Sequence, residues 1–265
     1  MEIKTTYALI TGATSGIGYE LALLFAKNGY NLIIVSRDLD ELQTKAIEFK
    51  DCGIDVKTIQ ADLFDVDSAF TVCEQAEAMG VEIEVLVNDA GQGLYGKFEN
   101  TDIRGELDII NLNISSLIVL TKYFIKKMSA RRSGKILNLA SIASKAPGPW
   151  QSVYHGTKAF VLSFTEAIRQ EVQDRNVIVT ALLPGATDTD FFNKAGMNES
   201  KIVQDKDALS DPKDVAKDGY EALMNNDDKV VSGFKNKMNV TMSNITPDSE
   251  LARQFDEKQK PVSED

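Results

Sequence analysis

The chain contains few of the residues that build disulfide, metal or histidine-based sites. Among its 265 residues are two cysteines, one histidine, one tryptophan and six prolines. Cys52 and Cys73 have no second cysteine or histidine near them in the sequence, so we expect free thiols and no metal centre. A chain of this length can bury a full core without such cross-links.

Positive charge is also scarce. The formal net charge is −11, from 29 Lys and Arg against 40 Asp and Glu, and the basic residues form no block. We therefore expect no nucleic-acid partner and no binding to an anionic membrane surface. An anionic ligand would depend on positive charge supplied locally by individual groups.

Long hydrophobic runs are missing as well. The longest apolar runs, such as residues 117–120, are far shorter than a membrane span. The first predicted strand follows Met1 too closely for the apolar stretch of a signal peptide. These features predict a cytoplasmic protein with no transmembrane segment.

The chain does have a regular alternation of short apolar runs and amphipathic stretches. The apolar runs have the character of buried strands and lie at 7–10, 31–35, 56–59, 85–87, 135–139 and 177–182. The alternation predicts βαβ units, and right-handed crossovers combine them into an α/β Rossmann-like fold: one doubly wound parallel sheet with helices on both faces. We place this single domain at residues 1–246. The charged tail, 247–265, is expected to be a frayed helix or disordered.

Two long helical patterns, 106–128 and 152–174, exceed what one face of the sheet needs. We expect them to form the interface of a homo-oligomer, with a dimer preferred to a tetramer. The polar stretch 193–210 is expected to be a loop that closes over a substrate.

A glycine-rich turn joins the first predicted strand to the first predicted helix. Its glycines let the backbone approach a pyrophosphate closely, and the helix N-terminus supplies free N–H groups and a partial positive charge. It is not a P-loop, because Gly-Lys does not follow at the required spacing. In this setting the turn predicts a dinucleotide site. The residues expected to hold the cofactor there are Gly12, Thr14, Ser15, Gly16, Ile17 and Gly18.

A second group of residues can carry acid–base chemistry. Tyr154 and Lys158 are four residues apart in a helical pattern, so both project from one face. A neighbouring ammonium favours the phenolate and is expected to lower the pKa of the tyrosine. Ser141 follows a predicted strand at the edge where α/β sheets bind ligands, and its hydroxyl is suited to hold a carbonyl oxygen.

Together these residues resemble the short-chain dehydrogenase/reductase family. Residues 11–18 match its TGxxxGxG turn, and Ser141, Tyr154 and Lys158 match its serine and YxxxK positions. Further motifs follow in order along the first three quarters of the chain: 88–91 is similar to NNAG, Asn113 to the asparagine of the catalytic helix, and 184–189 to the PG-to-threonine segment. The cofactor contacts that the resemblance adds are Asp62, Leu63, Asn88, Ala90, Gly91, Tyr154, Lys158, Pro184, Gly185, Thr187 and Thr189.

The resemblance implies an oxidoreductase that reduces a ketone or aldehyde reversibly by hydride transfer from a nicotinamide. It implies that Tyr154 donates the proton and that Lys158 contacts the nicotinamide ribose. Ser141 would steady the carbonyl oxygen and Asn113 would order a relay water. Two departures stand out: Asp89 replaces the second asparagine of NNAG, and the C-terminus lacks the glycine-rich ending of many 3-oxoacyl-acyl-carrier-protein reductases. Because this ending is missing, the resemblance does not extend to the substrate or the tetramer of those reductases.

The residues after the second predicted strand bear on cofactor choice. Ser36 lies where an NAD-selective carboxylate would bind the ribose 2′-hydroxyl, and the guanidinium of Arg37 suits a 2′-phosphate. We therefore predict NADP(H). The alternative is a solvated Arg37 beside a helix-capping Asp38, with little cofactor preference. Asp62 has a similar alternative as a helix cap.

Other functions have weaker support. A nicotinamide-binding sensor without turnover would have no need of an activated phenol. A sugar epimerase or dehydratase of the extended relatives would need a larger substrate domain. A hydrolase using His155 lacks the G-x-S-x-G turn, so this histidine is expected to pack or to lie at an interface. Trp150, Phe191 and Phe192 are left open between cavity lining and packing, and a neutral small carbonyl compound is the preferred substrate.

Overall fold

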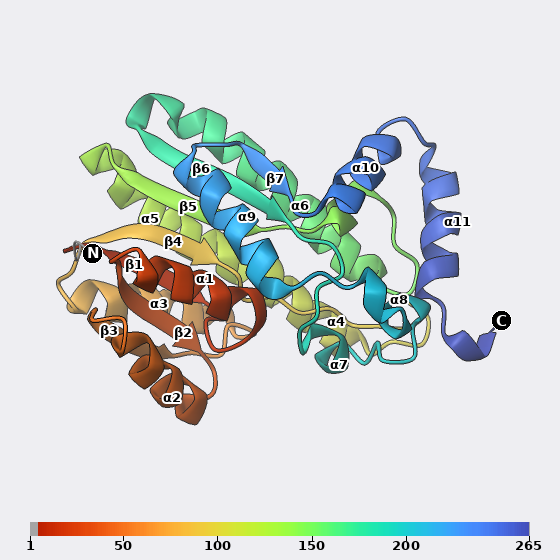
Figure 1. Ribbon diagram of the computed structural model, residues 1–265, viewed down its shortest axis with the longest axis horizontal. Helices are drawn as coiled ribbons and strands as arrows, with labels where there is room; N and C mark the ends of the chain where they lie inside the picture. Colours follow the sequence, from red (N-terminus) through yellow and green to blue (C-terminus); the bar gives the residue numbers. More distant parts are fainter. Residues whose placement is uncertain (1–4, 265) are drawn as a thin grey trace.

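A seven-stranded parallel sheet forms the centre of the molecule, with the strand order β3-β2-β1-β4-β5-β6-β7 (Figure 1). The computed structural model describes residues 5–264, so residues 1–4 of the predicted domain and residue 265 of the predicted tail lie outside the described residues. The strands are β1 (Tyr7–Thr11), β2 (Asn31–Ser36), β3 (Val56–Gln60), β4 (Ile83–Asn88), β5 (Gly134–Leu139), β6 (Val177–Leu183) and β7 (Lys229–Val231). The predicted fold class is confirmed. β7 escaped prediction because its three residues are too few to show a periodic pattern.

Helices cover both faces of the sheet because alternate side chains of the buried strands point to opposite sides. Ala8 and Ile10 of β1 pack with α1 (Gly16–Lys27), α2 (Leu39–Lys50) and α9 (Pro212–Met224). Tyr7 and Leu9 pack into the other layer. That layer comprises α3 (Val66–Ala78), α4 (Ile103–Ile110), the π-helical turn η1 (Asn111–Ser116), α5 (Leu117–Arg131) and α6 (Ser152–Val172). The remaining elements are η2 (Ile142–Lys145), η3 (Gln173–Arg175), α7 (Phe191–Lys194), α8 (Lys201–Gln204), η4 (Lys206–Ala208), α10 (Phe234–Ser243), α11 (Asp248–Gln259) and η5 (Val262–Glu264).

The continuous helical run Ile103–Arg131 has the length and apolar composition to cross a membrane. Core helices share these properties, and this run packs Leu120, Phe124 and Met128 into the core beneath the sheet. The sequence showed no such segment because the apolar positions are interrupted by polar ones at helical spacing. Length and composition are therefore weak grounds for a span here.

The C-terminal segment differs from the expected frayed or disordered tail. Residues 248–259 form α11, which places Leu251, Phe255 and Gln259 on one side at four-residue spacing. Leu251 and Gln259 are buried, and Trp150 Nε1 donates a hydrogen bond to Asp256 Oδ1 at 2.9 Å. The composition of the tail is polar, but its few larger side chains share one face, which is enough to hold the helix.

The chain beyond α11 pairs with the loop before α8. Lys201 N donates to Lys260 O at 3.3 Å, and Val262 N donates to Glu199 O at 3.0 Å. Ser200 and Pro261 form an antiparallel bridge between these segments. The last described turn is therefore fixed to the loop between β6 and α9.

A buried polar network connects the middle of the sheet to the helices beneath it. Asn88 Nδ2 donates to Asn138 Oδ1 at 2.8 Å and to Thr121 Oγ1 at 3.0 Å. Asn138 Nδ2 donates to Thr165 Oγ1 at 3.0 Å, and Asn138 is fully buried. Since buried amides are costly when unpaired, this network specifies how β4, β5, α5 and α6 meet.

We expect Asn138→Ala to lower the free energy of unfolding by about 3 kcal/mol, because it leaves an Asn88 donor with one partner fewer and Thr165 without its donor. Urea unfolding followed by circular dichroism measures the loss. The exposed Asn225→Ala serves as the control and is expected to change the free energy little. A loss at Asn138 no larger than at Asn225 would contradict the structural role of the network.

Candidate active site

A cavity of about 420 Å³ opens where the strands end at their carboxyl edge, beside the first βα turn. This is the position at which doubly wound sheets bind ligands. Most of the predicted site residues line it, drawn from segments far apart in the chain. These residues are Gly12, Thr14, Ser15, Gly16, Ile17, Ser36, Arg37, Asp62, Leu63, Ala90, Gly91, Ser141, Tyr154, Lys158, Pro184, Gly185, Thr187 and Thr189. Gly18, Asn88 and Asn113 are not part of the lining.

The glycine turn has the shape that a pyrophosphate requires. Gly12 and Gly16 adopt φ angles of 70° and 57°, in the left-handed region that favours glycine. A Cβ on Gly12 would lie 3.1 Å from Ala90 N, and one on Gly16 would lie 3.0 Å from Thr189 Cγ2. Ser15 makes no side-chain cap on α1, so the N–H groups that precede Gly18 are available to an anion. These residues fit the phosphates of a dinucleotide.

Asp89 lies directly behind this turn. A Cβ on Gly18 would come within 2.4 Å of Asp89 Oδ2, so Gly18 makes room for the carboxyl group and does not line the cavity. Removal from water raises the pKa of Asp89 to about 7, while Lys158 and a hydrogen bond from the Gly18 backbone oppose the rise. The extra carboxyl is thus held by a local N–H.

The residues after β2 form the rim of the cavity on the glycine-turn side. Thr14 Oγ1 and Ser36 Oγ lie 3.2 Å apart, and Arg37 lies with its guanidinium carbon 5.6 Å from the centroid of the Phe64 ring. Asp38 caps α2 by accepting from Glu41 N at 2.9 Å. The rim therefore presents a guanidinium and two hydroxyls, and the carboxyl group of Asp38 is engaged by its own helix.

Asp62 also lines the cavity, in the turn that follows β3. Its carboxylate accepts a hydrogen bond from Phe64 N at 3.2 Å. The N-cap of α3 is Asp65, so Asp62 does not cap this helix. Asp62 lies instead in a turn at the wall of the cavity.

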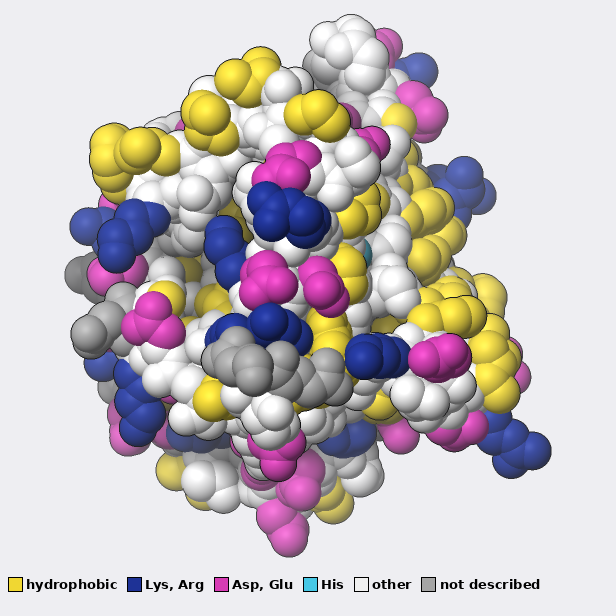
Figure 2. Space-filling model, turned by 90° about the vertical axis from the view of Figure 1, so that its right-hand side faces the viewer, with side chains coloured by type: hydrophobic (Ala, Val, Ile, Leu, Met, Phe, Trp, Pro, Cys, Tyr) yellow, Lys and Arg dark blue, Asp and Glu magenta, His cyan; other side chains and the backbone are white. Residues whose placement is uncertain are grey.

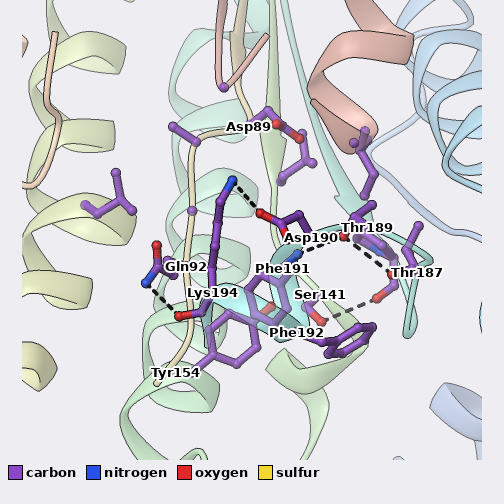
Figure 3. A pocket seen from close by; sticks show the side chains of 18 of the residues that line it. Asp89, Gln92, Ser141, Tyr154, Thr187, Thr189, Asp190, Phe191, Phe192 and Lys194 are labelled. Carbon is purple, nitrogen blue, oxygen red and sulfur yellow. Dashed lines mark hydrogen bonds and ion pairs between the residues drawn. The ribbon is translucent and has the colours of Figure 1, made fainter. Parts of the chain in front are cut away.

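Tyr154, Lys158 and Ser141 line the same cavity. Figure 3 shows Tyr154 and Ser141 on neighbouring parts of its wall. Burial raises the pKa of Tyr154 to about 12, and a hydrogen bond with Ser141 only partly offsets the rise. The expectation of a lowered tyrosine pKa is therefore wrong, because loss of hydration outweighs the hydrogen bond with Ser141. The phenol is neutral and able to donate a proton near pH 7.

Lys158 is buried with 6% of its surface exposed, and its Nζ lies 5.8 Å from the centroid of the Tyr154 ring. Nζ donates to Leu139 O at 2.8 Å. Burial lowers the pKa of Lys158 to about 8, and the charge of Asp89 opposes the shift. The amine is fixed at the end of β5, where it lies beside the ring of Tyr154 and beside Gly91.

Asn113 lies within the π-helical turn that interrupts the α4–α5 run. Its Oδ1 accepts from Gln92 N at 3.0 Å, and its Nδ2 donates to Gln92 O at 2.9 Å and to Thr157 Oγ1 at 3.0 Å. π-Helical turns redirect side chains and are common at functional sites. In this structure Asn113 fixes the chain after β4 against α6. The role of Asn113 in ordering a relay water stays a prediction.

Asn88 is placed differently from the expectation. It was predicted to contact the cofactor, but its side chain points under the sheet and bonds to Asn138 and Thr121. The motif pattern locates the end of β4 but does not say which side of the sheet each side chain faces.

The far wall of the cavity comes from residues for which the sequence predicts no site role, apart from Phe191 and Phe192, which it leaves open between cavity lining and packing. His155, expected to pack or to lie at an interface, is also part of this wall. The residues of the far wall are Gln92, Gln151, His155, Phe191, Phe192, Lys194, Met197, Ile202, Phe255 and Gln259. Phe191 and Phe192 belong to the segment between β6 and α9, which forms α7, α8 and η4 over the cavity. Trp150 packs instead, stacking on Tyr95 with ring centroids 5.5 Å apart. Gln151, one helical turn before Tyr154, could have been found by spacing. Phe255 and Gln259 gave no such signal.

Comparison with known proteins agrees with this geometry. The family model described as short chain dehydrogenase matches residues 6–200. The 17-beta-hydroxysteroid dehydrogenase type 3 of Mus musculus is 36% identical over 187 residues, which make up 69% of this chain and 60% of that protein. The alignment thus spans about three fifths of that relative. The ketoacyl reductase HetN of Nostoc sp. is 30% identical over 225 residues, or 84% of this chain and 77% of that protein.

Among solved structures, a short-chain dehydrogenase from Sphingobium yanoikuyae in complex with NADPH superposes with a TM-score of 0.81 at 27% identity. The superposition covers 91% of this chain and 93% of that chain. The superposition therefore covers a larger share of this chain than the family model matches.

We expect Asp89→Asn to raise the stability of the protein at alkaline pH. The pKa of Asp89 in the folded protein, about 7, lies above its ordinary value of 3.8. The stability that this group contributes is therefore present below pH 4 and is lost as the pH rises through 7. Asp89→Asn removes this pH-dependent loss of stability, so its melting temperature should exceed that of the wild type by roughly 5 °C at pH 8. The gain should shrink toward pH 4.

Thermal unfolding across this pH range measures the effect, with Asp108→Asn on the exposed side of α4 as the control. If the difference in melting temperature did not depend on pH, it would not arise from ionisation of the Asp89 carboxyl. A variant less stable than the wild type at pH 8 would contradict the prediction in the same way.

Proposed function

Because the chain belongs to the short-chain dehydrogenase family, we propose that it reduces a ketone or an aldehyde to an alcohol with NADPH, and runs the oxidation in reverse. The observation that carries the proposal is the meeting of Ser141, Tyr154 and Lys158 beside the glycine turn in one cavity. The oxidoreductase class follows from the family. The carbonyl substrate and the cofactor preference are the proposal.

The residues of the glycine turn would hold the phosphates of the cofactor, and Lys158 would hold its nicotinamide ribose. The chemistry that a bound reduced nicotinamide supplies is a hydride for the carbonyl carbon. The carbonyl oxygen accepts a hydrogen bond from Ser141 Oγ and the proton from the Tyr154 hydroxyl, which is neutral because its pKa is about 12. The positive charge of Lys158 stabilises the phenolate that remains. Asn113 fixes Gln92 and Thr157 around these groups.

Two observations support NADPH over NADH. Ser36 and Arg37 form the rim where the adenosine ribose would lie, and the nearby Asp38 carboxylate is engaged as the cap of α2. A guanidinium can bind a phosphate through two parallel hydrogen bonds. The similar Sphingobium yanoikuyae dehydrogenase was solved in complex with NADPH.

The names of the relatives bear on the substrate. They describe enzymes of hydroxysteroids and of ketoacyl compounds, whose carbonyl or hydroxyl groups are attached to large apolar bodies. Phe191, Phe192 and Met197 give the cavity of this chain an apolar wall. We therefore favour a ketone with an apolar body as the substrate.

A homodimer formed through the long helices is also part of the proposal. On α6, Phe160 is 38% exposed and stacks on Phe164 with ring centroids 5.7 Å apart. Such an exposed aromatic pair on a long helix suits an isologous interface.

Tyr154→Phe should lower kcat for carbonyl reduction by at least about a thousandfold, because the variant loses the proton donor. The dissociation constant for NADPH should stay within about twofold, since the phenol does not hold the phosphates. Loss of NADPH absorbance at 340 nm measures turnover, and fluorescence titration measures binding. Retained turnover in the variant would reject the mechanism, whereas an inactive wild type that binds NADPH would favour a nicotinamide sensor.

Arg37→Ala should weaken NADPH binding by about a hundredfold, because it removes a charge-assisted contact to the 2′-phosphate. NADH binding should change little. Titration of both cofactors against wild type and variant measures the difference, and the matched Arg37→Lys should restore part of the NADPH affinity. Equal losses for the two cofactors would show that Arg37 does not read the phosphate.

A further inference from the structure

Two buried amide groups in the cavity are not used by the proposed chemistry. Gln151 is 5% exposed and Gln259 is 3% exposed, and both line the far wall. Within the described part of the chain, Gln151 Nε2 and Gln259 Oε1 have no hydrogen-bond partner. Native proteins rarely leave such groups unpaired, and a cavity wall is where a ligand can pair them.

The orientation of Gln259 follows from His155. His155 Nδ1 lies 2.8 Å from Ala146 O, and since a carbonyl oxygen only accepts, Nδ1 carries the proton. His155 Nε2 is then an acceptor and receives the Gln259 Nε2 donor at 3.2 Å. Burial lowers the pKa of His155, which keeps the ring neutral. The remaining atom of this amide, Oε1, is a hydrogen-bond acceptor.

Gln151 lies near the edge of the Tyr154 ring. A Cβ on Gly93 would be 2.8 Å from Gln151 Nε2 and 3.5 Å from Tyr154 Cδ2. Both groups therefore border the small space that the absent side chain of Gly93 leaves. From this wall Gln151 Nε2 offers a hydrogen-bond donor close to Tyr154.

The surroundings of these amides are apolar or already neutralised. Phe191, Met197 and Phe255 line the same cavity. The ammonium of Lys194 pairs with Asp190 Oδ2 at 3.1 Å rather than remaining available to an anion (Figure 3). The face of the molecule that carries α10 and α11 shows acidic and basic side chains interspersed, with apolar side chains beside them (Figure 2). This environment favours an uncharged ligand.

We propose that the substrate is a ketone with an apolar body and a second, neutral polar group, a hydroxyl, that binds Gln151 and Gln259. A hydroxyl accepts from Gln151 Nε2 and donates to Gln259 Oε1, so it suits a wall that offers one donor and one acceptor. A carboxylate would face the Gln259 acceptor, and a purely apolar ketone would leave both amides unpaired. The inference rests on the proposed carbonyl reduction and identifies its substrate class. Gln151 and Gln259 are specificity-determining residues in this account.

The test compares ω-hydroxy-2-alkanones with 2-alkanones in which a methyl group replaces the hydroxyl, over chain lengths of about five to ten carbons. Binding is measured by calorimetry on NADPH-loaded Tyr154→Phe protein, which does not turn the ketones over. At one or more lengths the hydroxyketone should bind about tenfold more tightly than its methyl partner. Gln259→Leu and Gln151→Leu, each combined with Tyr154→Phe, should reduce that ratio to about one while leaving the methyl ketone bound as before.

Gln254→Leu is the matched control, because Gln254 is exposed on the same helix as Gln259. It should leave the tenfold ratio unchanged. Equal affinity of the two series at every length would overturn the inference, as would a preference that survives both glutamine variants. Turnover of the same ketones by the wild type is measured separately. A binding preference without turnover would support the subsite and reject the reductase, and turnover without a preference would do the reverse.

Discussion

The in-register pairing of β1, β4 and β5 is the constraint on which the site depends. Thr11 is paired with Asn88, and Asn88 with Asn138, so the three strands end at the same level. Thr11 Oγ1 then accepts from both Asp89 N and Ala90 N at 3.1 Å. This contact ties the glycine turn to the end of β4. A shift of one strand by one residue would move the glycine turn, the amine of Lys158 and the hydroxyl of Ser141 apart from one another.

The parts of the molecule that repeat or that follow a motif could be predicted from the sequence. Alternating apolar runs showed the sheet, and the glycine turn with Tyr154 and Lys158 located the cavity. Direction and environment could not be predicted in the same way. Asn88 points under the sheet, and the pKa of Tyr154 rises because the pocket removes water from it. Both depend on tertiary packing that no local pattern encodes.

The far wall shows a different limit of sequence reasoning. α11 has a polar composition, yet it is held by the chain around residues 95 and 150. Tyr95 donates a hydrogen bond to the backbone oxygen of the buried Gln259, and Trp150 donates one to Asp256. A short polar segment such as this tail forms a helix poorly in isolation, and its helix is held by contacts with residues distant in sequence. A substrate pocket assembled in this way can change its specificity while the cofactor side stays the same.

The pairing of residues 260–262 with residues 199–201 has a practical consequence for handling the protein. The two termini lie at opposite ends of the molecule, and the C-terminus follows directly on the paired segment beside the cavity (Figure 1). A purification tag or a surface linkage at the C-terminus would put mechanical load on this paired segment beside the cavity. Attachment at the N-terminus, next to the start of β1, avoids load on this segment, so immobilised enzyme should be coupled there.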